Sequence, residues 1–562
     1  MSGTLHFIDL VIILFYFAII LWIAWWVSKG SGKNKGNRDS KDYFLAGKSA
    51  GWFVIGASLF ASNIGSEIII GVSGAGARGE MPQANFEIIA ALILILLGWL
   101  FVPFYLRSGV YTMPEFLEIR YSKACRNYLS VVSILAYVIT KISLIIFAGA
   151  LVFETMGISF WTGAIITILA TGFYTVLGGL KAVIYTDMIQ TFILLAGTGA
   201  VTYFGLHQLG GWDAMMETIT QASLEPGNPP SEGFFNLWRP SDDTNYPWTG
   251  MLFGAPILGV WYWCTDQFIV QRTLSAKNIS NARKGTLFAG FLKLLPVFLF
   301  FLPGVIAFAL AQKGMLNFSL DNPDKALPAM INNFLPIGLK GLAISGLLAA
   351  LMSSLSSAFN SSSTLITFDF YKQYKPQASE KELVLVGQLA TLVLVIASFL
   401  WIPFMKTLMG GGLFHYLQSV QAYISPPIAA VFLFGLFFKW INAKGAIVSL
   451  WLGFALGMFR LIAEYLSKEG IISIVPGSLL QILLDINFLH YAIYLFIFST
   501  IILLVVSKFG VQKEQEILQL VTFNREETKF KFKWTTDTIL TIILITCVLA
   551  LWVIFSPLGI GV

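Results

Sequence analysis

Hydroxyl side chains that could bind a small cation line the stretch 345–364, which reads SGLLAALMSSLSSAFNSSST. A helix would place four of them on one face, because they recur at spacings of three and four: Ser353, Ser354, Ser357 and Ser361. Hydroxyl oxygens suit a hard cation such as sodium, which prefers oxygen ligands without needing full carboxylates. Small residues also let helices pack closely, and serine hydroxyls often bond to their own helix. The serine face alone leaves both interpretations open.

A second stretch, 57–76, reads ASLFASNIGSEIIIGVSGAG and could complete such an oxygen set. It is apolar at both ends, but its middle contains glycine and four polar residues, Ser62, Asn63, Ser66 and Glu67. This composition predicts a helix that breaks. A broken helix survives in hydrocarbon only where it lines a cavity or is buried in protein, and secondary transporters use such breaks to bind substrate and ion. The carbonyls of Ala61 and Ile64 would then face the serines, which favours an ion site and transport.

The composition places the chain in a membrane. Its mean hydropathy is +0.76, 56% of its residues are hydrophobic and 12% are charged, well outside soluble usage. Three distant cysteines imply no disulfide framework, and the residues show no Cys/His metal cluster. Four scattered histidines and no nucleophile paired with a base argue against an enzyme, and we predict none.

A window of about 19 residues gives about fourteen candidate spans. The sequence therefore predicts an all-α integral membrane protein. The first apolar run is long enough to span and lacks a cleavage site, so we predict a retained helix. The spans lie near 8–28, 51–77, 83–106, 127–154, 158–178, 185–207, 248–271, 285–312, 338–371, 382–405, 412–438, 443–466, 487–507 and 536–558.

Basic residues alternate between the loops. The loop after the first span is rich in Lys and Arg, and every second loop holds most of the 36 such residues, which identifies these loops as cytoplasmic. An even number of spans with both termini extracytoplasmic follows. The polar segment 208–247 becomes an extracellular loop, and the charged segment 508–533 becomes a cytoplasmic one. Few cysteines and no long outer domain favour a bacterial inner (plasma) membrane for this multi-pass chain.

Ten of the spans form two groups of five, and an odd number per group inverts the second group. Each group opens with an interrupted helix, 57–76 in the first and 254–271 in the second, as inverted-repeat transporters do. We therefore divide the chain into an N-terminal extra helix with its basic loop (1–50), a first repeat (51–207), the extracellular loop (208–247), a second repeat (248–438) and C-terminal extra helices (439–562).

Ionisable residues inside spans are costly and therefore suggest function. They are Glu67, Glu87, Asp187, Asp266, Lys293 and Arg460. Three have structural alternatives: Asp187 could be a solvated helix end, Arg460 could extend its charge to the membrane surface, and Asp266 could pair with Arg272. A polar uncharged solute such as a sugar is best held by amides and carboxylates above an aromatic face. Asn63, Glu87, Lys293 and Gln418 supply the polar groups, and Phe86, Trp261, Tyr262, Trp263 and Phe414 the aromatic ones.

At these residues the chain resembles the sodium:solute symporter family, particularly its sodium/glucose cotransporter branch. The stretches that carry the resemblance span the whole ten-helix core: GASLFASNIGSE (56–67), FVPFYLRSGVYTMPEFL (101–117), GGLKAVIYTDMIQT (178–191), WYWCTDQFIVQRTLSAKN (261–278), LAALMSSLSSAFNSSSTLITFDFY (348–371) and YLQSVQAYISPPIAAVF (416–432). The resemblance implies a five-plus-five inverted repeat of the leucine-transporter type with extra flanking helices.

The resemblance also implies roles for individual residues. A sodium site falls on Ala61, Ile64, Ala350, Ser353 and Ser354, and the acidic position tied to a second sodium in some members is Asp187. Sugar contacts fall on Asn63, Glu87, Lys293 and Gln418, with Trp263 beside the gate. The gates fall on Tyr262, Phe86 and Phe414.

The chain departs from its sugar-carrying relatives at four positions: Ile68, Gly259, His415 and Gln421. Ile68 stands where relatives usually have His or Gln, so one sugar hydrogen bond is missing, typically about 1–3 kcal/mol. A deoxy sugar or a cyclic polyol would fit this more apolar corner.

We therefore predict a sodium-coupled symporter that imports a glucose- or galactose-like hexose by alternating access, with sodium as the co-transported ion. The alternative within the class is another polar solute, such as inositol, a sugar acid or sialic acid. A channel or a solute sensor is a further alternative. We expect sodium, a small sugar-like solute and the lipid bilayer as partners, with no nucleic acid and no obligate protein partner.

Overall fold

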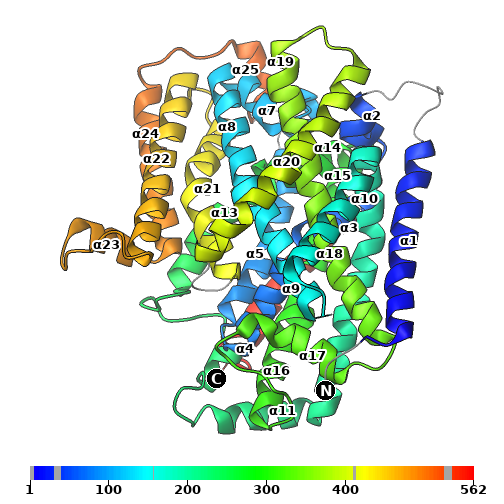
Figure 1. Ribbon diagram of the computed structural model, residues 1–562. Coiled ribbons are helices and arrows are strands. Elements are labelled where there is room, and N and C mark those ends of the chain that lie inside the picture. Colours follow the sequence, from blue (N-terminus) through cyan, green and yellow to red (C-terminus); the bar gives the residue numbers. More distant parts are fainter. Residues whose placement is uncertain (1–4, 31–39, 156, 409–412, 524–533, 562) are drawn as a thin grey trace.

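The computed structural model describes residues 5–30, 40–155, 157–408, 413–523 and 534–561. Within these ranges the chain is helical, and its only bridges are isolated contacts between Ala50 and Ala276 and between Arg239 and Pro247. Most helices stand roughly upright and side by side (Figure 1). The predicted all-α membrane architecture is confirmed.

The long helices are α1 (Phe7–Gly30), α3 (Trp52–Asn63), α4 (Ser66–Ala77), α5 (Pro82–Leu96), α8 (Lys123–Ala136), α9 (Ser143–Thr155), α10 (Phe160–Leu209), α15 (Ile279–Leu292), α16 (Leu302–Gln312), α18 (Leu339–Leu365), α20 (Glu380–Leu408), α21 (Leu413–Phe437), α22 (Ala443–Lys468), α24 (Phe488–Ser507) and α26 (Thr536–Ile554). Shorter helices include α2 (Ser40–Leu45), α6 (Val102–Ser108), α7 (Met113–Arg120), α11 (Trp212–Ala222), α17 (Ala326–Phe334), α23 (Leu479–Asp485) and α25 (Gln515–Val521).

In the described ranges, ten helices are long and apolar enough to cross a bilayer, and the bent pair α3–α4 adds an eleventh. The other three predicted spans also fall on helices. They correspond to the apolar segment Phe160–Phe173 of α10, to the interrupted run 250–274, and to α20. The first two differ from the prediction by a shared helix and by an interruption, and the third, α20, is one continuous helix of 29 residues.

The first predicted break lies between α3 and α4, whose axes differ by 63°. Ile64 leaves helical geometry at φ −84° and ψ 84°, and Gly65 is extended. Asparagine and serine favour such a break because their side chains compete for hydrogen bonds with backbone groups. Glycine favours it because it has no Cβ that would restrict the backbone conformation. The prediction that 57–76 breaks is confirmed.

The second interrupted helix passes through several conformations. A π-helical turn, η4 (Gly250–Gly254), precedes α13 (Ala255–Gly259), and a second one, η5 (Val260–Thr265), ends at Asp266, which is extended. The chain resumes as α14 (Gln267–Leu274), whose first turn is capped because the Asp266 carboxylate accepts from the Phe268 amide at 3.2 Å. The predicted interruption within 254–271 is confirmed.

Helix α10 joins two predicted spans, 158–178 and 185–207, across a kink at Gly179. Gly179 has φ +59°, and a Cβ there would lie 2.5 Å from the Tyr43 carbonyl oxygen. Glycine is therefore required by both conformation and space. Asp187 lies two turns beyond this kink and is 0% exposed. The alternative that Asp187 is a solvated helix end is wrong, because the second half of α10 packs against α3 and α18.

Helix α18 is buried over nearly its whole length and packs against α10, α1 and α20. Its start is fixed by α1, where the Asp9 carboxylate accepts from the amides of Gly338 at 2.7 Å and Gly341 at 2.9 Å. Satisfying these free amides stabilises a helix N-terminus. The serine-bearing face of α18 therefore belongs to a buried helix that is anchored at its start.

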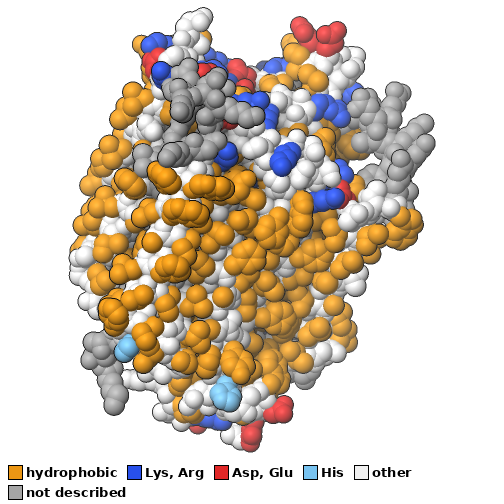
Figure 2. All heavy atoms as spheres, turned by 90° about the vertical axis from the view of Figure 1, so that its right-hand side faces the viewer, with side chains coloured by type: hydrophobic (Ala, Val, Ile, Leu, Met, Phe, Trp, Pro, Cys, Tyr) orange, Lys and Arg blue, Asp and Glu red, His pale blue; other side chains and the backbone are white. Residues whose placement is uncertain are grey.

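Viewed from one side, a broad hydrophobic band covers the molecule, and most Lys and Arg in this view gather at the upper rim (Figure 2). Large apolar side chains of α1 are exposed in the band, as lipid contact requires: Leu14, Phe15, Trp22, Trp25 and Trp26. Both chain ends lie at the opposite, lower end (Figure 1). The basic rim and the chain ends therefore lie at opposite ends of the molecule.

Candidate functional site

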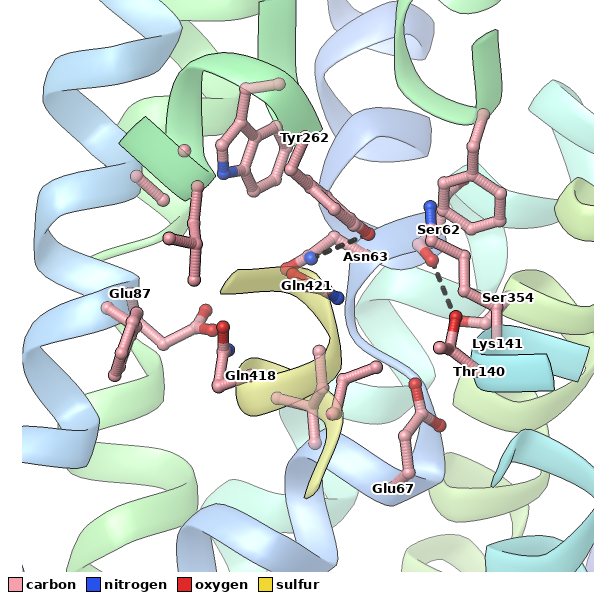
Figure 3. Close-up of a pocket in the computed structure, with 18 of the residues that line it drawn as sticks. Ser62, Asn63, Glu67, Glu87, Thr140, Lys141, Tyr262, Ser354, Gln418 and Gln421 are labelled. Carbon is pink, nitrogen blue, oxygen red and sulfur yellow. Dashed lines mark hydrogen bonds between the residues drawn. The ribbon is translucent and has the colours of Figure 1, made fainter. Parts of the chain in front are cut away.

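A central cavity lies between the two interrupted helices, and its empty space is about 750 Å³ including the part open to solvent (Figure 3). Six predicted substrate or gate residues line it: Asn63, Phe86, Glu87, Tyr262, Trp263 and Gln418. The side chain of Phe414, the other predicted gate, lies outside the described part of the chain.

The two interrupted helices meet at this cavity through their side chains. The Asn63 amide, at the end of α3, donates to the Tyr262 hydroxyl in η5 at 2.9 Å. The Arg272 guanidinium of α14 donates to the Ser58 hydroxyl at 2.9 Å. If one interrupted helix moves, either these hydrogen bonds break or the other interrupted helix moves with it.

Lys293 lies behind the cavity wall rather than in its lining. It follows the last residue of α15, is 0% exposed and donates to the Asn63 carbonyl oxygen and the Glu87 carboxylate. Its ammonium lies 5.2 Å from the centre of the Trp263 ring. In this arrangement Lys293 orients Asn63 and Glu87, while Gln418 and Glu87 face the cavity together (Figure 3).

A second buried pair lies at the other side of the cavity. Lys141, in the π-helical turn η3 (Tyr137–Ile142), donates to the Asp266 carboxylate at 2.6 Å, and Tyr137 donates to the same carboxylate. The Lys141 ammonium also lies 4.3 Å from the Tyr262 ring centre. The alternative that Asp266 pairs with Arg272 is wrong, because Arg272 pairs with Asp187 at 3.6 Å.

Lys141 was not among the predicted site residues, although it lines the cavity. The sequence does contain a sign of its importance: Lys141 lies inside the apolar span 127–154, and a charged side chain in such a span needs a partner. Thr140 also lines the cavity, as do Ile68, Gly259 and Gln421, three of the four departures from the family pattern. His415, another departure, lies outside this lining, in a separate groove between α21 and α22.

The predicted sodium ligands fall where the first break approaches α18. The Ser354 hydroxyl lies 2.8 Å from the Ser62 carbonyl oxygen and 3.5 Å from that of Ala61. Ile64 is the non-helical residue of the break, and Ala350 lies one turn before Ser354 on α18. Carbonyl and hydroxyl oxygens without carboxylates are a ligand set suited to a monovalent cation.

Asp187 forms an adjoining oxygen cluster. Its carboxylate accepts from Ser58 at 2.6 Å, Ser62 at 3.1 Å and Ser353 at 2.6 Å. Ser353 therefore links the predicted sodium site to Asp187. The Arg272 guanidinium supplies the countercharge for the carboxylate in this state, which explains how a buried aspartate is tolerated.

The family model of the sodium:solute symporter family matches residues 43–453. The chain belongs to this family. Sodium/glucose cotransporter 1 of Oryctolagus cuniculus is 40% identical over 525 residues, which cover 89% of this chain and 78% of that protein. Sodium/glucose cotransporter 2 of Rattus norvegicus is 37% identical over 548 residues, covering 93% and 81% respectively. Sodium is accordingly the co-transported ion of this symporter.

Solved structures show the fold. The substrate-bound outward-open state of a Na+-coupled sialic acid symporter has a TM-score of 0.76 at 23% identity, covering 91% of this chain and 99% of that chain. Mhp1, a nucleobase-cation-symport-1 family transporter, has a TM-score of 0.52 at 14% identity, covering 86% and 98%. The predicted leucine-transporter type of architecture is confirmed.

Proposed function

We propose that this symporter imports a neutral hexose of the glucose or galactose type, driven by sodium. The proposal rests on one observation: the α3–α4 break contacts both the predicted sodium ligands and the central cavity. On one side, the α3–α4 break faces the Ser353–Ser354 pair of α18. On the other, its last helical residue, Asn63, belongs to a cavity lined by polar and aromatic side chains.

Sodium would bind the carbonyls of Ala61, Ile64 and Ala350 and the hydroxyls of Ser353 and Ser354. Binding there would hold α3 against α18 and so favour one arrangement of the cavity. The Asp187 cluster, one hydroxyl away through Ser353, is the proposed second sodium position. Sodium and sugar are coupled because each ligand stabilises the arrangement that the other prefers.

A sugar would lie against the rings of Tyr262 and Trp263 and hydrogen-bond to Glu87, Gln418 and Asn63. Lys293 would act mainly by holding Glu87 and Asn63 in place. Phe86, Tyr262 and Phe414 would close the cavity. The relatives named as sodium/glucose cotransporters support this substrate class.

The basic rim would face the cytoplasm of a bacterial cell, and both ends of the chain would be extracytoplasmic. The two inverted repeats would cover 51–207 and 248–438, with the extra helices of 1–50 and 439–562 outside them. Reaction of single cysteines introduced at exposed Leu224 and Val511 with an impermeant reagent tests the orientation. In intact cells only the cysteine at 224 should react.

Uptake of labelled glucose and galactose into proteoliposomes tests the function. Uptake should require an inward sodium gradient and stop when the gradient is dissipated. A panel of unlabelled inositol, sugar acids and sialic acid as competitors identifies the solute class. Equal uptake with and without sodium would contradict the coupling.

A further inference from the structure

Helix α1 lies at the edge of the molecule (Figure 1), and none of its residues is among the predicted ligands. It packs against α10 and α18, the two helices that carry Asp187 and Ser353. One face of α1 exposes large apolar side chains such as Leu14 and Trp22. The other face carries Tyr16, which is 3% exposed. A hydroxyl buried at such a position needs a hydrogen-bond partner within the protein.

The Tyr16 hydroxyl joins α10 to α18. It accepts a hydrogen bond from the amide nitrogen of Gln190 at 2.9 Å and donates to the sulfur of Met352 at 3.6 Å. Gln190 lies three residues after Asp187 on α10, and Met352 directly precedes Ser353 on α18. The Tyr16 contact therefore lies beside the hydrogen bond from Ser353 to Asp187, which joins the same two helices at 2.6 Å.

Gln190 is a buried donor close to the proposed second sodium position. It is 1% exposed, and its acceptor atom Oε1 has no hydrogen-bond partner among the described residues. Residues three apart share one face of a helix, so the Asp187 carboxylate lies within one turn of the Gln190 amide. An N–H group binds a carboxylate more strongly than a neutral hydroxyl. Tyr16 therefore engages a donor that would otherwise bind Asp187.

We infer that Tyr16 is a positioning residue of the ion site, whose hydroxyl holds the Gln190 amide away from Asp187 and keeps that carboxylate available to sodium. The inference rests on the proposed second sodium position at Asp187. An amide that donates to the carboxylate takes up one of its acceptor sites and competes with the cation. Helix α1 thereby sets the sodium affinity without supplying a ligand.

Tyr16→Phe tests this role, because it removes the hydroxyl and keeps the ring. The measurement is sodium-dependent thermal stabilisation of the purified full-length protein, with choline replacing sodium at constant ionic strength, so no sugar is needed. The sodium concentration for half-maximal stabilisation should rise at least about fivefold, because one hydrogen bond to the carboxylate competes with the ion. Tyr203→Phe removes an exposed hydroxyl from α10 and is the matched control, with no expected change.

Removal of the competing amide separates positioning from a merely structural contact. Tyr16→Phe combined with Gln190→Leu should return half-maximal stabilisation to within about twofold of the unmodified protein, since no donor is left to compete. A contact that only braced α10 against α18 would leave the double variant at least as impaired as Tyr16→Phe. Gln190→Leu alone should also stay within about twofold, and a rise in that variant would show that the amide supports the ion.

One further variant distinguishes failure of the inference from failure of the proposed ion site. Ser353→Ala removes a proposed sodium ligand and should itself raise the sodium concentration for half-maximal stabilisation. If Ser353→Ala changes the titration but Tyr16→Phe does not, or if Gln190→Leu fails to restore the double variant, the inference is wrong. If Ser353→Ala leaves the titration unchanged, the proposed sodium position fails and the inference fails with it.

Discussion

The two interrupted helices of this symporter break in different ways. At the α3–α4 break, the residue before α4 is Gly65, which offers no side-chain cap, and the hydroxyl of Ser66 and the Oε2 of Glu67 have no hydrogen-bond partner. At the η5–α14 break, Asp266 caps the new helix and also accepts from Tyr137 and Lys141. Polar groups at the first break therefore lack hydrogen-bond partners, whereas the Asp266 carboxylate at the second break is fully hydrogen-bonded by the protein.

This difference assigns separate tasks to the two breaks. Buried polar groups without partners are costly, so a break that leaves several is stable only if ligands complete them. A break closed by its own carboxylate and a buried lysine needs no ligand. This contrast supports our proposal that the first break binds the ligands, and it suggests that the second break holds Tyr262 and Trp263 in place.

The largest effect should come from opening the second break. Asp266→Ala removes the partner of buried Lys141 and the cap of α14, and should destabilise the protein by about 3–5 kcal/mol. The midpoint of heat-induced loss of monodisperse protein in size-exclusion chromatography measures this. The double variant Asp266→Asn with Lys141→Met removes both charges and should recover part of the loss. Wild-type stability of Asp266→Ala would contradict the structural role.

The second-largest effect should come from Lys293, which hydrogen-bonds to Asn63 at the first break and to Glu87 in the cavity lining. Lys293→Ala leaves Glu87 unpaired and frees Asn63, so half-saturation by sugar should rise by about 30- to 160-fold, which corresponds to about 2–3 kcal/mol. Sodium-dependent uptake into proteoliposomes measures it. Gln418→Ala, which removes one cavity-facing amide, should raise half-saturation by about tenfold. Normal uptake by both variants would exclude this cavity as the sugar site.

A smaller effect is expected on the ion side of the first break. Ser354→Ala should raise the sodium concentration for half-maximal uptake by about tenfold, since one hydroxyl ligand is worth about 1–1.5 kcal/mol. Sugar half-saturation at saturating sodium should change less than twofold, or about 0.4 kcal/mol. Ser361→Ala is the matched control, because within the described ranges that hydroxyl bonds to the Ser357 carbonyl of its own helix, at 2.8 Å, and to no other group. Equal sodium dependence of the two variants would place the ion elsewhere.

The smallest effect should come from a methyl group added at the first break. Gly65 has φ −83° and ψ 169°, which other residues adopt freely, and an added Cβ would meet only the flexible Glu67 carboxylate. Gly65→Ala should therefore change stability by less than about 1 kcal/mol. Gly179→Ala, at positive φ and 2.5 Å from a carbonyl, should cost more. The reverse order in a thermal unfolding series would show that the first break is the more constrained one.

Sequence patterns predicted the elements that depend on local chemistry. Hydropathy located the spans. The polar middle of 57–76 located the first break, because side chains that compete with backbone hydrogen bonds affect the backbone at their own position in the chain. The resemblance placed Asn63, Glu87, Tyr262 and Gln418 together. Their assigned roles in binding stay predictions.

Side-chain partners were predicted less well, because partners depend on how distant helices cross. Arg272 lies six residues after Asp266 in the chain, but the backbone turns at Asp266, so the guanidinium faces Asp187 of α10 instead. The Asp9 cap of α18 joins residues more than 300 positions apart and has no local signal. Lys141 likewise meets Asp266 only through the packing of η3 against the second break.

The hydroxyls of α18 are divided into two uses. Ser361 and Thr364 donate to carbonyls four residues earlier, at 2.8 and 2.7 Å, whereas Ser353 and Ser354 donate outward to α10 and α3. Ser357 does both, because its hydroxyl contacts the Ser353 carbonyl of its own helix at 2.6 Å and the Ser62 hydroxyl of α3 at 3.1 Å. Helix α18 is also buried over nearly its whole length and anchored to α1 at its start. If sodium binds at the proposed site, we therefore expect its release to the cell interior to come from withdrawal of the α3 carbonyls, so the exit rate should depend on the mobility of α3 rather than on that of α18.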